Sequence, residues 1–226
     1  MRLIRASLGA LTVALVSACG GGGGSDVPPE QPPPAVLTTY IKASNTGAGD
    51  AFGGAVAVSA DASTLVIAAP DEDSAARGIN VDQGNGAFDA GAVYVFVRNE
   101  KGWLQQAYIK ASNAEQGDSF GSSVAISSDG NTLAVGASLE DGPDQGVNGD
   151  QGNGVLSSGS VYVFVRNGST WSQQAYVKAR NAGEGDQFGI AVALSGDGNS
   201  LAVGAPGEAS ASTTVDGDED DNSEIR

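Results

Sequence analysis

Acidic side chains have the greatest capacity for chemistry in this sequence. Asp and Glu number 27 against 11 Lys and Arg, which gives a formal net charge of −16. Three segments of twenty residues, 71–90, 139–158 and 207–226, occupy equivalent places and together hold 16 of the 27 acids. Loops of this length in a compact domain are usually functional or disordered. We expect them to form one acidic rim, which would attract divalent cations or basic partners.

Oxygen-bearing side chains recur at alternate positions within these segments, which is the spacing that calcium-binding loops use. The candidate ligands are Asn80, Asp82, Asn148, Asp150, Asp216, Asp218 and Asp220. Ca²⁺ takes about six to eight oxygen ligands, so this set is incomplete. The alternative is a solvated acidic loop that keeps the surface soluble. Calcium is the one cofactor for which the sequence offers ligands, and both interpretations stay open.

The composition excludes several other classes of chemistry. The sequence contains no histidine, which excludes Ser-His-Asp and Cys-His catalysis in their usual forms. The excess of acids argues against binding to nucleic acid, which needs clustered bases. Two carboxylates could act as general acid and base, but no spacing selects a pair. We therefore expect a non-enzymatic protein, and the alternative is an accessory or glycan-processing module that uses paired carboxylates.

The first eighteen residues predict export from the cytoplasm. Arg2 and Arg5 precede thirteen uncharged residues, 6–18, which is fewer than the roughly 20 that a membrane-spanning helix needs. This pattern fits a secretory signal peptide. The sequence LVSAC at 15–19 resembles the lipobox of bacterial lipoproteins, which implies cleavage before Cys19 and attachment of fatty acids, palmitate among them. The alternative is a plain secretory signal with an incidental cysteine.

Residues 19–35 predict a tether between the lipidated cysteine and a folded body. Five glycines at 20–24 are flexible, and the Pro-rich stretch 26–34 is stiffer. Several acyl chains on one residue anchor a protein firmly to a membrane. Since Gly20 rather than Asp follows the cysteine, the lipoprotein resemblance implies the outer membrane of a bacterial envelope.

Residues 36–226 repeat with a period of 68, and we divide them into 36–103, 104–171 and a shorter 172–226. The sequence DAFG at 50–53 recurs as DSFG at 118–121 and as DQFG at 186–189. The aspartates that open these motifs predict turn caps, because Asp readily accepts hydrogen bonds from nearby backbone amides. No gap is needed to align the three copies.

The first two copies contain four strand signals each and the shorter third copy contains three, which predicts an all-β fold. In the second copy they are 103–110, 121–127, 132–137 and 160–166, each bounded by Gly, Asn or Asp. The last of these is apolar on both alternating faces, so its sheet needs neighbours on both sides. Four-stranded sheets that repeat and stack face to face describe a β-propeller.

The repeated motifs resemble the FG-GAP repeat of integrin α-subunits. The FG pairs are Phe52, Gly53, Phe120, Gly121, Phe188 and Gly189. The segments AAP, GAS and GAP at 68–70, 136–138 and 204–206 match the rest of the motif. The resemblance implies an extracellular propeller that binds or adheres to a protein or glycan. Its calcium loops lie between the FG and GAP strands, where each copy here has a single acid: Asp61, Asp129 or Asp197.

The sequence predicts eleven strands, or about 2.75 blades, whereas propellers have about four to eight. We therefore expect an incomplete ring, completed by further blades from a longer chain or from other copies. Three interpretations stay open: a fragment of a longer product, assembly with other copies, or a broken gene. We favour the first or the third, because the last repeat stops where its next strand should begin. Trp103 and Trp171 predict packing of an outer strand, and the alternative is a platform for a sugar.

Overall fold

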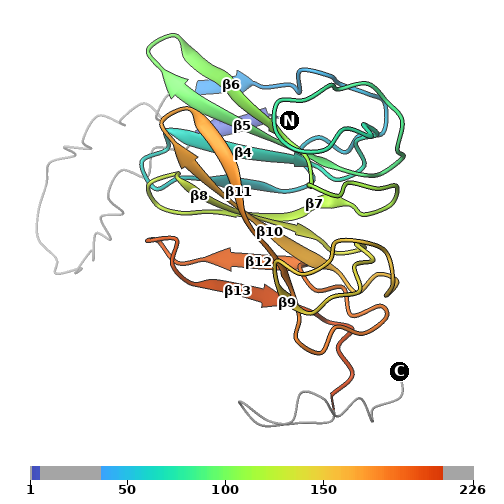
Figure 1. Cartoon of the computed structure of the whole chain (residues 1–226). Helices are drawn as coiled ribbons and strands as arrows, with labels where there is room; N and C mark the ends of the chain where they lie inside the picture. The colour runs from blue at the N-terminus through green and yellow to red at the C-terminus, as the bar shows by residue number, and fades with distance from the viewer. Residues whose placement is uncertain (1, 6–36, 211–226) are drawn as a thin grey trace, which may run out of the picture. The chain divides into compact units, whose positions relative to one another are not determined.

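The computed structural model describes residues 2–5 and 37–210, which divide into two compact units (Figure 1). The first unit, residues 1–41, contains β1 (Arg2–Arg5) and β2 (Leu37–Tyr40). These strands pair antiparallel, with Arg2 opposite Tyr40. The signal sequence that we predict for residues 1–18 and the lipidation site Cys19 otherwise lie outside the described residues.

The second unit, residues 42–226, contains three antiparallel sheets. The first sheet has the order β3-β4-β5-β6, with strands Val56–Val58, Thr64–Ala69, Ala92–Asn99 and Gly102–Ile109. The second has the order β7-β8-β10-β11-β9, with strands Phe120–Ile126, Thr132–Ala137, Ser160–Asn167, Thr170–Lys178 and Gly146–Val147. The third pairs β12 (Ala191–Leu194) with β13 (Leu201–Gly204).

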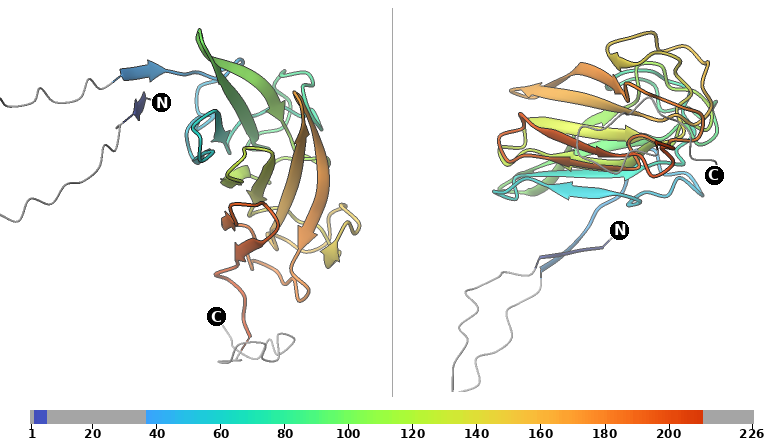
Figure 2. Two further views of the ribbon diagram at one scale, coloured as in Figure 1. Left: turned by 90° about the vertical axis from the view of Figure 1, so that its left-hand side faces the viewer. Right: turned by 90° about the horizontal axis from the view of Figure 1, so that it is seen from below.

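The sheets stack face to face in chain order (Figure 2). Strand β7 packs across β3, β4 and β5, and β12 packs across β7 and β8. The first strand of each sheet therefore covers the sheet before it. In the part of the chain that the structure describes, the stack does not close into a ring.

The hydrophobic core lies between the first and second sheets. All six residues of β4 are buried, and so are the first five of β5. Val66, Val93, Leu133 and Val135 belong to one continuous apolar cluster. A strand buried on both faces needs a covering layer on each side, and the stacked sheets supply it.

The structure confirms the all-β prediction and the eleven predicted strands, and it adds β1 and β9. The sheets are offset from the sequence repeats. Strand β6, which opens the second sequence copy, completes the first sheet by pairing with β5, so that Ile109 lies opposite Val93. The described residues include no helix that is long and apolar enough to cross a membrane.

Local turn chemistry explains the hairpins between the first two strands of each sheet. Gly130 and Gly198 have φ angles of 70° and 72°, a region that glycine enters at little cost. The Asp129 carboxylate accepts hydrogen bonds from the Ser127 hydroxyl at 2.6 Å and from the Asn131 amide at 3.0 Å. These bonds lower the pKa of Asp129. The Asp-Gly-Asn sequence thus favours the tight hairpin between β7 and β8.

Candidate functional site

The FG motif positions one set of loops at the same end of every sheet. The buried carboxylate of Asp118 accepts a hydrogen bond from the Glu115 amide at 2.8 Å, and Asp50 and Asp186 make the same contact with Gly47 and Gly183 at 2.6 Å. These bonds confirm the predicted turn caps. Each cap fixes the backbone just before the FG pair.

The phenylalanine and the glycine of the motif have different partners. The Phe120 ring packs edge-on against Tyr162 of its own sheet, with 5.3 Å between the ring centroids. Gly121 lies instead against Ala68 and Val93 of the preceding sheet. The glycine therefore allows the backbone of the second sheet to approach these side chains of the first sheet closely. Phe120 itself is fully buried in the core that the first and second sheets share.

A buried ion pair lies at the loop end of the second sheet. Lys178 Nζ lies 3.0 Å from Glu140 Oε2, and each side chain is only 1% exposed. The Tyr176 hydroxyl donates to Glu140 Oε2 at 2.9 Å, and Asn113 Nδ2 donates to Glu140 Oε1 at 2.9 Å. The Tyr162 hydroxyl in turn donates to Asn113 Oδ1. The charge of Glu140 is thus met on both carboxylate oxygens.

The first sheet repeats this arrangement 68 residues earlier. Lys110 Nζ lies 2.8 Å from Glu72 Oε2, and Glu72 Oε1 accepts bonds from the Tyr108 hydroxyl at 2.9 Å and from Asn45 Nδ2 at 2.7 Å. In the third copy, Asn181 Nδ2 donates to Glu208 Oε1 at 3.0 Å. We call these contacts the Lys-Glu-Asn network.

Burial shifts the acid–base properties of this network. Desolvation lowers the pKa of Lys110 and of Lys178, and the paired glutamates oppose that shift. Desolvation also raises the pKa of Asp118 to about 7, opposed by the hydrogen bond from the Glu115 amide and reinforced by the charge of Glu140. The two Lys–Glu pairs of the network are closed to solvent, so their charges stabilise the bases of the loops.

The network joins the three segments that bear the loops. Glu72 and Glu140 open the long loops. Lys178 ends β11, and Lys110 directly follows β6. The asparagines belong to the turn before the FG pair. Sequence reasoning missed these residues. Their signal was present, since YIKASN recurs at 40–45 and 108–113 and as YVKARN at 176–181, but charged residues normally predict an exposed position.

The FG motif that opens each sheet and the stacking of the sheets agree with the comparison with known families. The model of the FG-GAP repeat matches residues 103–164 and 171–222, about half of the chain. The chain belongs to the FG-GAP repeat family. A comparison with curated proteins finds no match.

The calcium ligands predicted in the first two long loops have partners within the chain. Asn80 Oδ1 accepts a hydrogen bond from the Tyr108 amide and Asn148 Oδ1 one from the Tyr176 amide, each at 2.9 Å. Asp150 Oδ1 accepts a bond from the Gly152 amide at 3.0 Å, and Asp82 Oδ1 one from the Gly84 amide at 3.3 Å.

No three acidic side chains converge as a metal site within residues 2–5 and 37–210. Asp216, Asp218 and Asp220 lie outside the described residues. The calcium site therefore stays a prediction. The asparagines that were its candidates in the first two loops dock those loops onto β6 and β11.

Trp171 packs as an outer-strand residue of its FG-GAP repeat. Its side chain is buried, and its Nε1 donates to Gln106 Oε1 of the first sheet at 2.9 Å. The Arg166 guanidinium lies 5.4 Å from the centre of the Trp171 ring. The packing prediction is confirmed for Trp171, and this ring is not open to a sugar.

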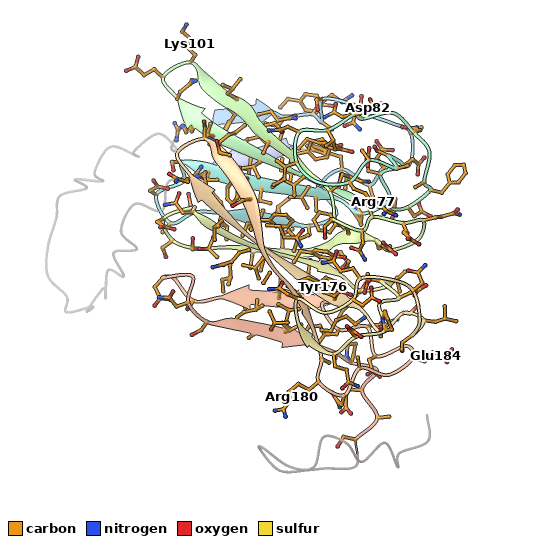
Figure 3. The ribbon with its side chains drawn as sticks, in the orientation of Figure 1. Arg77, Asp82, Lys101, Tyr176, Arg180 and Glu184 are labelled. Atoms are coloured by element: carbon orange, nitrogen blue, oxygen red, sulfur yellow. The ribbon has the colours of Figure 1, made fainter. Side chains whose placement is uncertain are left out.

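The long loops of the FG-GAP repeats lie side by side with the turns that precede the next FG pair. We call this surface, made by residues 71–90, 111–119, 139–158 and 179–187, the loop face (Figure 1). The Gly117 amide donates to the Phe88 carbonyl at 3.0 Å, and the Gly185 amide donates to the Leu156 carbonyl at 2.9 Å. Arg77 and Glu184 lie at this side, whereas Lys101 lies at the opposite end of the sheets (Figure 3).

Two large apolar side chains project from the loop face at equivalent positions. Phe88 is 68% exposed and Leu156 is 61% exposed, and the two positions are 68 residues apart. Sequence reasoning missed them, because a Phe and a Leu normally predict burial. Asp89 follows Phe88 directly, and its amide donates to Asp73 Oδ1 at 3.1 Å. The pKa of the nearby Asp71 is raised by burial and then by the charges of Asp89 and Asp73.

Proposed function

We propose that this FG-GAP chain is a non-enzymatic binding module whose loop face takes a protein partner with basic and apolar side chains. The observation that carries the proposal is the equivalent exposure of Phe88 and Leu156 on neighbouring repeats. Contiguous exposed apolar patches rimmed by polar residues are typical of interaction sites, and we propose that these two side chains belong to one such patch. Because the neighbouring repeats present them in register, a partner can contact both at once.

Charge supports a basic partner. The two described long loops carry nine acids, Glu72, Asp73 and Asp89 among them, and one base, Arg77. Arg77 forms an exposed ion pair with Glu115 of the next repeat at 3.3 Å. The net field of the loop face is therefore negative, which favours encounter with cationic surfaces and weakens in salt.

The test uses the full chain and immobilised helical peptides made of Leu and Lys, of Leu and Glu, or of Ser and Lys. We expect binding only to the Leu/Lys peptide, with affinity falling as sodium chloride rises. The double variant Phe88→Ser/Leu156→Ser should lose at least about tenfold in affinity, because two buried apolar contacts are each worth more than about 1 kcal/mol.

The matched control is Leu104→Ser, which removes an exposed apolar side chain from β6. It should bind the Leu/Lys peptide like the unchanged chain. A glycan array forms a separate arm. Equal binding by the double variant, or binding to glycans alone, would overturn the proposed protein-binding role.

We also propose that the module is held on the bacterial envelope, at the outer membrane, by fatty acids on Cys19. The support is the sequence LVSAC at 15–19 and the Gly/Pro-rich tether that follows. Cleavage before Cys19 removes β1, so β2 loses that pairing partner in the mature chain. Incorporation of labelled palmitate in a bacterial host, abolished by Cys19→Ser, is the expected result. Equal labelling of the variant would contradict this anchor.

A further inference from the structure

The stack of sheets ends in two faces that the other sheets of residues 42–210 leave uncovered. On the first sheet, Val56 and Val58 of β3 are 47% and 53% exposed. Their counterparts in the second sheet, Val124 and Ile126, are half-buried and pack against the common core. Side chains alternate along a strand, so Val56 and Val58 point away from Ala55 and Ala57, which do join that core. The branched side of β3 therefore faces outward.

The opposite end of the stack shows the complementary side. In β12, Val192 and Leu194 are half-buried, whereas Ala191 and Ala193 are exposed. The counterpart of Ala191 in the second sheet is Ser123, whose hydroxyl donates to the Gly189 carbonyl of the third sheet at 2.6 Å. The small-residue side of each first strand thus faces the sheet that follows, and on β12 this side is open.

Both internal interfaces place the branched residues of one sheet on the small residues of the sheet before it. The two uncovered faces are the two halves of that interface. We propose that the β3 face of one copy of this chain docks on the β12–β13 face of a second copy, head to tail, and so continues the stack between molecules.

The glycines of the motif fit this docking. Gly189 lies against Gly136 of the preceding sheet so closely that a methyl group at Gly136 would overlap the Gly189 carbonyl. Gly204 is the counterpart of Gly136 in the third sheet. A methyl group there would meet only Ala191 of its own sheet, at 3.5 Å. Gly53 of a second copy can therefore approach Gly204 as Gly189 approaches Gly136.

At a second pair of positions, a larger side chain on one side of the junction is matched by a smaller one on the other. Within the stack, Gly130 packs on Thr64 and Gly198 packs on Thr132. At the junction between copies the corresponding residues are Ala62 and Ser200. Alanine adds a methyl group where the other hairpins have glycine, and serine lacks the methyl group of threonine. The summed volume of the pair is preserved.

Backbone hydrogen bonds also join neighbouring sheets at the hairpins, and each runs from an amide of one sheet to a carbonyl of the sheet that follows. The Ala60 amide donates to the Ser128 carbonyl at 3.1 Å, and the Ser128 amide donates to the Gly196 carbonyl at 2.8 Å. In the head-to-tail arrangement, the Gly196 amide of one copy donates to the Ala60 carbonyl of the next. The contact is heterologous, so it generates a ring if the rotation closes and a filament if it does not.

The first test is cysteine crosslinking in the full chain carrying Cys19→Ser. Val56→Cys and Ala193→Cys are made in separate chains, mixed, and oxidised. A head-to-tail contact predicts a disulfide-linked dimer in the mixture and little of it in either variant alone. A Leu104→Cys chain mixed with Ala193→Cys is the matched control, since Leu104 is 58% exposed on β6, away from the proposed contact.

The second test is molar mass by light scattering over a range of concentrations. The full chain should associate as concentration rises, and Val58→Asp should shift the midpoint at least about tenfold upward, because it places a charge in an apolar contact. Leu104→Asp should leave the midpoint unchanged, and thermal unfolding checks that both variants remain folded. A chain that stays monomeric, or crosslinks equally in the Leu104→Cys control, overturns the proposal. Dimers of Val56→Cys alone would indicate a symmetric contact and overturn it as well.

Discussion

Lys178 Nζ lies 3.0 Å from Glu140 Oε2, and the pair is excluded from solvent between the end of β11 and the base of a long loop. Two residues 38 positions apart are thereby joined at the point where the loop leaves the sheet. The equivalent pair Lys110 and Glu72 does the same for the first sheet. The loop face thus rests on charges that water cannot reach.

Removal of one member of this pair should be costly. Glu140→Gln leaves the Lys178 ammonium buried without its counter-charge, and we expect a loss of about 3–5 kcal/mol in the free energy of unfolding. Urea unfolding followed by circular dichroism measures it. Arg77→Ala breaks the exposed ion pair with Glu115 and should cost less than about 1 kcal/mol. Equal costs for the two variants would show that burial of the inner pair has no energetic weight.

Alanine substitutions at two glycines should distinguish the cost of a steric clash from the cost of backbone strain. Gly91 has a φ of 79°, and a methyl group there would overlap the Phe120 backbone. Gly102 has a φ of 121°, and a methyl group would meet nothing within 4 Å. In both alanine variants the left-handed backbone should lower the free energy of unfolding by roughly 1–2 kcal/mol.

Gly91→Ala should lose at least about 2 kcal/mol more than Gly102→Ala, because only the former forces the two sheets apart. Thermal unfolding of the two variants measures the difference. A cost for Gly91→Ala no larger than that for Gly102→Ala would mean that the sheets move apart freely at this junction.

The pH dependence of stability should report on Asp118. Its folded-state pKa is raised to about 7, above the unfolded value near 3.9, so the folded state holds a proton that the unfolded state releases. The contribution of Asp118 to stability is full below about pH 4 and is lost as the pH rises towards 7. Within that window the free energy of unfolding should fall by at most roughly 1.4 kcal/mol for each step of one in pH.

Asp118→Asn keeps an acceptor for the Glu115 amide and removes the titration. The variant should be more stable than the unchanged chain at pH 8, and its stability should fall less between pH 5 and pH 8. Asp61→Asn is the control, because the Ser59 hydroxyl lowers the pKa of Asp61 to about 2, outside this window. Chemical unfolding at four pH values decides the matter, and parallel curves for the Asp118→Asn variant and the unchanged chain would contradict it.

The strands and turns were predictable because their signals are local. Apolar runs such as VYVFV at 161–165, and the Asp-Gly-Asn hairpin at 129–131, carry their information in neighbouring residues. The Lys-Glu-Asn network was not predictable in this way. Lys178 is buried because Glu140, Tyr176 and Asn113 converge on one point from three segments, and no local pattern encodes that convergence.

On the loop face, the sequence-based expectation fails in the opposite direction, because an apolar residue is exposed. Phe88 would be assigned to a core from its side chain alone, whereas it is 68% exposed, and its carbonyl accepts a hydrogen bond from the Gly117 amide. Asn148 was a candidate ligand because of its oxygen and its spacing. The structure assigns that oxygen to the Tyr176 amide, a contact between residues 28 positions apart in the sequence.

Asn148 therefore provides the sharpest test of the calcium prediction. Its side-chain oxygen accepts the Tyr176 amide, and its φ of 57° lies in the left-handed region that asparagine and aspartate tolerate. Asn148→Ala should cost about 1–3 kcal/mol, through the lost acceptor and the backbone strain, to the same extent in calcium chloride and in EDTA. Asn148→Asp retains both the acceptor and the backbone preference, and should unfold near the temperature of the unchanged chain in either buffer.

If the side chain instead ligates calcium, ligand binding to the folded state raises the unfolding temperature of the unchanged chain only in calcium chloride, and the cost of Asn148→Ala grows there. A calcium-dependent difference between the two variants would thus reverse the structural assignment of Asn148.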